Sequence, residues 1–90
     1  MTAIERVLLA QTLDAIARLS RRSLSPLDLA ALLQAVAQTL RTQGSAFHAG
    51  IAEVGQRLTA IVAAEQDAAA TSAQALAVTE ALRLRLTDVL

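Results

Sequence analysis

The chain has 90 residues, with eight acidic and eight basic side chains and therefore no formal net charge at pH 7. Twenty-one alanines and sixteen leucines dominate its composition, whereas Cys, Trp, Tyr and Lys are absent and His, Phe and Met occur once each. This composition excludes disulfides and thiolate chemistry, lacks the strongly basic face of a nucleic-acid-binding protein, and fits one helical domain over residues 1–90.

Residues 3–22 are predicted to form the first helix. Their large apolar side chains recur at helical spacing along one side, and charged residues occupy the other side. The apolar side is formed by Leu8, Leu9, Leu13, Ile16 and Leu19. Arg18, Arg21 and Arg22 lie at the carboxyl end, where cations complement the helix dipole. Contact with a small anion or a lipid headgroup is the alternative role for this cluster.

A second helix is predicted over residues 26–43. Ser25 can cap it, Pro26 suits the first helical position, and Asp28 in the first turn complements the dipole. Its apolar stripe consists of Leu29, Leu32, Leu33, Val36 and Leu40. Gly44 can adopt the left-handed conformation beyond the helix end, and Ser45 can cap the segment that follows. The chain is therefore expected to reverse direction here.

Residues 46–90 are predicted to form a single long helix, because they contain no Pro and no Gly after Gly55. A four-three ladder runs through Phe47, Ile51, Val54, Leu58, Ile61, Glu65, Ala68, Ser72, Ala75, Thr79, Leu82, Leu86 and Val89. Such a seven-residue repeat predicts a left-handed supercoil. The first two helices, with a kink at Pro26, would lie nearly end to end against this long helix in a helical hairpin.

The middle of the ladder supports an alternative. Residues 63–75 contain no large apolar side chain, and alanine fills most of them. Thr71 and Gln74 have capping-box spacing, so a break near Thr71 would give a four-helix bundle instead. The fold class is all-α in either case. Glu65, the acidic position of the ladder, is interpreted as a polar break in the apolar seam, or alternatively as a determinant of register or oligomeric state.

Reactive side chains are too few for an enzyme site. His48 is the only histidine, and neither a second His nor a Cys is present to complete a metal site. Glu53 with Arg57, and Glu80 with Arg83, have the spacing of solvated helix ion pairs. No glycine-rich phosphate loop is present. We therefore expect no catalytic residues, no metal and no cofactor, and a protein that is not an enzyme.

The ladder predicts a structural or interaction protein that associates with itself into a homo-oligomer or polymer. The expected contact residues are Phe47, Ile51, Val54, Leu58, Ile61, Ala68, Ser72, Ala75, Leu82, Leu86 and Val89. The alternatives are an adaptor that binds an amphipathic helix of another protein, and a peripheral membrane protein that uses the arginine-bearing first helix. Leu84 lies off the ladder and is either plain surface or part of a second contact face between subunits. Without a signal peptide or a membrane-spanning stretch, the chain is expected in the cytoplasm.

Overall fold

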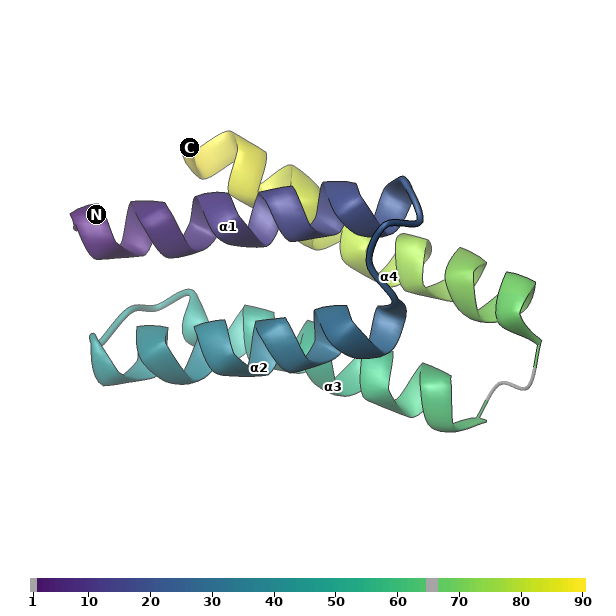
Figure 1. Ribbon diagram of the computed structural model, residues 1–90. Helices are drawn as coiled ribbons and strands as arrows, with labels where there is room; N and C mark the ends of the chain where they lie inside the picture. The colour runs from purple at the N-terminus through teal and green to yellow at the C-terminus, as the bar shows by residue number, and fades with distance from the viewer. Residues whose placement is uncertain (1, 65–66) are drawn as a thin grey trace.

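Four helices run alternately up and down in the computed structural model, which describes residues 2–64 and 67–90. They are α1 (Ala3–Ser20), α2 (Pro26–Thr42), α3 (His48–Ala64) and α4 (Ala68–Val89). Figure 1 shows α1 and α2 side by side, α3 behind α2, and α4 crossing behind α1, with both termini at the same end of the bundle. The described ranges contain no strand, and the all-α prediction is confirmed.

The structure does not contain the predicted single helix over residues 46–90 or the hairpin built on it. It has the alternative four-helix fold instead. Helix α3 ends at Ala64, and Asp67 caps α4, its carboxylate accepting a 3.2 Å hydrogen bond from the Ala69 amide. The break therefore precedes Thr71, whose hydroxyl donates to the Asp67 carbonyl at 3.0 Å inside the first turn of α4. Position 65, the acidic position of the predicted ladder, lies outside the described residues.

Packing explains why the chain breaks there. A reversal before α4 folds its apolar side back onto α1 and α3, so that Ala75, Leu82 and Leu86 become buried in the same molecule. A continuous helix would leave that side uncovered until a second molecule arrived. In the alanine-rich segment, no large side chain is present to stabilise a continuous helix by packing. In the four-helix bundle, each additional buried methylene group contributes about 0.8 kcal/mol.

Local signals place the other helix ends. The Ser25 hydroxyl accepts a 3.1 Å hydrogen bond from the Asp28 amide, and Pro26 begins α2 as predicted. Gly44 has φ +73° directly after α2, which confirms the predicted reversal. Helix α1 is shorter than the predicted 3–22 range, because the chain already turns at Arg22, which has φ +61°.

The core lies along the centre of the bundle and receives side chains from all four helices. Its fully buried large members are Leu9, Leu29, Leu33, Leu40, Ile51, Leu58 and Leu86, with Thr12 and Thr79. Helices α2 and α3 pack together most extensively. Gly55 of α3 faces α2 at this contact, where an added Cβ would lie 3.1 Å from the Gln34 amide nitrogen and 3.4 Å from the Cβ of Leu33. Helix α1 packs less closely on α2 and leaves a groove between them.

Candidate interaction surface

The ion pairs of the described residues are exposed, and each lies within a single helix. Arg57 lies 2.9 Å from Glu53 and Arg83 lies 2.6 Å from Glu80, as their spacing predicts. The hydrogen bonds and positive charge of Arg83 lower the pKa of the Glu80 carboxyl. Within residues 2–64 and 67–90, no group of three His, Cys, Asp or Glu side chains is placed to hold a metal ion. His48 is half-buried at the start of α3.

The predicted contact residues lie mostly inside the single chain. Five are buried in its core: Ile51, Leu58, Ala75, Leu82 and Leu86. Four are half-buried, namely Phe47, Val54, Ile61 and Ser72, while Ala68 and Val89 are exposed. The ladder was correctly identified as an apolar side, but the bundle itself covers most of it. A partner could reach the five buried residues only if the bundle opened.

A groove between α1 and α2 offers an accessible apolar surface instead. Its volume is about 560 Å³, and its apolar and amide lining comes from Val7, Ala10, Gln11, Ala15, Leu24 and Leu32. Val7 is 56 % exposed and Leu32 is 37 % exposed, although both are large apolar side chains. A smaller apolar hollow formed by Ala3, Ile4, Val7 and Leu8 adjoins the groove at Val7. We refer to these residues together as the α1–α2 groove.

The groove follows from where α1 places its residues. Leu9, Ile16 and Leu19 point into the core, whereas Val7 lies largely outside it. Ala10 and Ala15 line the space between the two helices, and their single methyl groups are too short to fill it. Ile4, Val7 and Gln11 are spaced three and four residues apart on one side of α1, away from its core side. The spacing of Ile4, Val7 and Gln11, which differs from that of the core residues of α1, is the sequence signal that could have revealed this surface.

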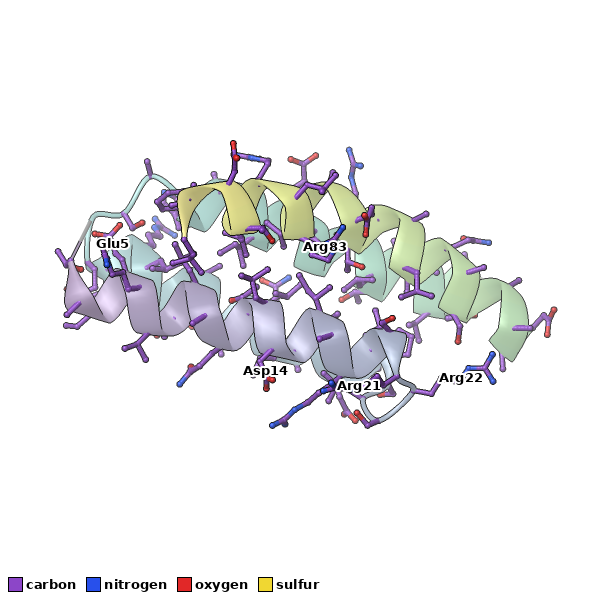
Figure 2. All side chains as sticks on the ribbon, turned by 90° about the horizontal axis from the view of Figure 1, so that it is seen from above. Glu5, Asp14, Arg21, Arg22 and Arg83 are labelled. Carbon is purple, nitrogen blue, oxygen red and sulfur yellow. The ribbon has the colours of Figure 1, made fainter. Side chains whose placement is uncertain are left out.

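Charges lie at one end of the groove. Arg18 pairs with Asp14 at 3.0 Å along its edge. Arg21 and Arg22 follow at the α1–α2 turn; both are exposed, and neither forms an ion pair within the described part of the chain. Figure 2 shows Asp14 and Arg21 extending from the side of α1 that faces away from α4. The groove thus has an apolar end near Val7 and a basic end near the turn.

A hydrogen-bonded carboxylate holds the amino end of α1 in place. The Thr2 amide donates to Glu5 Oε1 at 3.2 Å, and the Ser45 hydroxyl, from the α2–α3 turn, donates to Glu5 Oε2 at 2.9 Å. These bonds, with the Thr2 backbone first in effect and Ser45 second, lower the pKa of the Glu5 carboxyl. The same Ser45 hydroxyl accepts a hydrogen bond from the Phe47 amide at 3.2 Å just before α3. Glu5 therefore links α1 to the turn beyond α2.

Helix α4 carries a second apolar surface. Leu84, the residue off the predicted ladder, is 55 % exposed, and Leu76 is also exposed. Ala69, Ala73 and Ala77 are exposed on the same side of the helix by their spacing. We call these five residues the α4 surface. Ala69, Ala73 and Leu76 also line a hollow of about 590 Å³ with Leu24 of the α1–α2 turn and Pro26 of α2, and Leu24 belongs to the lining of the α1–α2 groove as well. Ala77 and Leu84 line neither hollow.

None of the described helices is long and apolar enough to cross a membrane. Comparison of the chain with protein-family models, with curated proteins and with solved structures finds no match.

Proposed function

We propose that this protein is a non-enzymatic structural protein that associates with itself into a homo-oligomer, and that the α1–α2 groove is one side of the contact. The observation that carries the proposal is that three exposed large apolar side chains, Ile4, Val7 and Leu32, cluster around one groove. Clustered exposed apolar side chains on a small folded protein are typical of interaction sites.

The energy available from this surface is modest. Full burial of a Leu, Ile or Val side chain contributes about 1.5–3 kcal/mol. Ile4 and Val7 are about half exposed, so covering each one contributes roughly 1 kcal/mol. Association costs at least about 4 kcal/mol in lost translational and rotational freedom. Covering these two side chains alone does not offset that cost, so the contact must also bury apolar side chains of the partner. We therefore expect it to be reversible and dependent on protein concentration.

Light scattering of the pure protein across concentration tests the proposal. The average mass should rise with concentration, and Val7→Asp should keep the protein monomeric because a carboxylate in the groove cannot be desolvated cheaply. Leu27→Asp is the matched control. Leu27 is 55 % exposed on α2, but it lies five residues before Leu32 and projects to another side of the helix. A monomer at every concentration would contradict self-association.

The open groove also favours a second candidate, an adaptor that binds an amphipathic helix of a different protein. A groove of about 560 Å³ between two helices has the shape that such a helix requires. The same light-scattering experiment separates the two candidates, because an adaptor would remain monomeric when pure. A membrane-bound role for α1 has less support, since Leu9, Ile16 and Leu19 of that helix pack into the bundle.

A further inference from the structure

We propose that the α1–α2 groove of one copy receives helix α4 of the next copy, in a head-to-tail contact that can repeat. This inference rests on the self-association proposed above and names the surface that fills the groove. It starts from two clusters of exposed large apolar side chains on different helices: Ile4, Val7 and Leu32 around the groove, and Leu76 and Leu84 on α4. A contact between unlike surfaces leaves one free surface at each end, so that further copies can add.

The shapes of the two surfaces fit each other. Ala69, Ala73 and Ala77 are small, so the backbone of α4 can approach a neighbouring helix closely along this side. By helical spacing Leu76, Glu80 and Leu84 lie on the same side of α4 as this strip, and the two leucines are the side chains that would enter the groove. Ala10 and the buried Ala15 line the groove with single methyl groups, so a helix could lie over the seam between α1 and α2.

The spacing of the large side chains sets a register. Leu76 and Leu84 are eight residues apart, which is about 12 Å along a helix. Val7 and Ala15 are separated by the same eight residues on α1. With α4 running parallel to α1, Leu76 of the next copy reaches the apolar end beside Val7. Leu84 then reaches the part of the groove lined by Ala15, Leu24 and Leu32.

The charges favour this direction over the reverse. Asp88 follows Leu84 by one helical turn, is exposed, and forms no ion pair within the described residues. In the parallel register it lies opposite the basic end of the groove, where Arg21 is unpaired. Glu80, on the same side of α4, lies opposite Gln11. In the antiparallel direction, Asp88 would face the apolar end formed by Ala3, Ile4, Val7 and Leu8, whose lining contains no arginine side chain.

Complementation between single-surface variants tests the head-to-tail contact. Val7→Asp disables the groove and keeps the α4 surface, whereas Leu84→Asp disables the α4 surface and keeps the groove. Both residues are more than half exposed, so both variants should fold, which circular dichroism verifies. Each variant alone should be monomeric. An equimolar mixture should form a one-to-one dimer and nothing larger, while Leu27→Asp should associate like the wild type.

Each other outcome has a definite meaning. If the wild type stays monomeric at every concentration, self-association itself is wrong. If the wild type associates and Leu84→Asp associates equally well, the groove pairs with another groove, and the head-to-tail contact is wrong. If both single variants are monomeric and their mixture stays monomeric, the two surfaces do not meet each other. The last two results overturn this inference while leaving the proposed function standing.

Charge reversal tests the parallel direction. Asp88→Arg and Arg21→Asp should each weaken association, and the protein carrying both changes should recover it, because the pair is restored with its signs exchanged. Arg6→Asp is the control, since Arg6 lies off the groove side of α1. If the double variant does not recover association while the mixture of Val7→Asp and Leu84→Asp still pairs, the parallel direction assigned to α4 is wrong.

Discussion

Replacing Arg22 by Gly should stabilise the protein, because the chain contains two helix ends of the same design with different residues at the key position. After α1, the Ser23 amide donates to the Arg18 carbonyl at 2.9 Å and the Arg22 amide donates to the Leu19 carbonyl at 3.0 Å. This is the Schellman pattern, in which the residue beyond the cap takes positive φ and is usually Gly. Here Arg22 adopts φ +61°.

The turn after α2 provides the internal reference. The Ser45 amide donates to the Leu40 carbonyl at 2.9 Å and the Gly44 amide donates to the Arg41 carbonyl at 3.0 Å. Gly44 has φ +73°, and no atom lies within 4 Å of the place where a Cβ would be added. Replacing Gly44 by Ala therefore changes the free energy of unfolding through the backbone conformation and not through contacts of the added methyl group. The two turns thus share one hydrogen-bond pattern, and Arg22 carries a side chain at the position where the other turn has none.

The magnitude follows from two opposing terms. A residue with a Cβ in the left-handed region costs about 1–2 kcal/mol. Replacing Arg22 by Gly removes this strain. Gly also increases the conformational entropy of the unfolded chain, which lowers the free energy of unfolding by about 0.4–1 kcal/mol and offsets part of the gain. Arg22→Gly should therefore raise the free energy of unfolding by roughly 0.5–1 kcal/mol, and Gly44→Ala should lower it by a similar amount. For a domain of this size, that corresponds to a change in Tm of roughly 2–8 °C.

Urea unfolding followed by circular dichroism measures these differences, at one low protein concentration so that association does not contribute. Arg22→Ala separates backbone from side chain, because it keeps the Cβ at positive φ while removing the exposed guanidinium. It should stay within about 0.5 kcal/mol of the wild type. If Arg22→Gly is no more stable than Arg22→Ala, the strain assigned to this turn does not exist.

Further substitutions test other parts of the structure. Glu5 has a lowered pKa in the folded chain, so its stabilising effect is present above its ordinary value of 4.5 and is lost as pH falls through the lowered one. Glu5→Gln should accordingly lose less stability than the wild type on acidification, as urea midpoints would show. Leu58→Ala, in the fully buried core, should lower stability by about 2–5 kcal/mol, measured by urea unfolding. Gly55→Ala should be tolerated, because the added methyl meets the flexible Gln34 amide at 3.1 Å and Ala favours the helix by about 1 kcal/mol. Gly55→Leu should overpack the α2–α3 contact and lower Tm in a thermal melt.

The sequence predicted well those features that are determined within one turn of chain. Ser25 and Pro26 mark the start of α2, and Gly44 marks the reversal after it, because caps and positive φ depend on neighbouring residues alone. The start of α4 has a weaker local signal, because Asp67 caps the helix but neither Gly nor Pro precedes it after Gly55. Its position depends on distant contacts, since Ala75 and Leu86 become buried only when α4 folds back onto the rest of the bundle. Local propensity favours continuing an alanine-rich helix, and packing overrides it.

The candidate site shows the same division between local pattern and tertiary arrangement. A four-three spacing identified Ile51, Leu58 and Leu86 as members of an apolar side, and they are buried. Spacing alone carries no information on whether the covering helix belongs to the same molecule or to another. The exposed pair Ile4 and Val7 could have been noticed from its own spacing, but the depth of the groove depends on how far apart α1 and α2 settle.

Small residues occur at both the tight and the open contacts of this bundle. Between α2 and α3, Gly55 faces Leu33 closely, and the absence of a side chain lets the two helices approach. Between α1 and α2, Ala10 and Ala15 line a groove that the neighbouring described residues do not fill. A small residue closes a contact only when the facing helix supplies the volume that the small residue lacks. For the α1–α2 groove, we propose that a helix from another molecule supplies that volume.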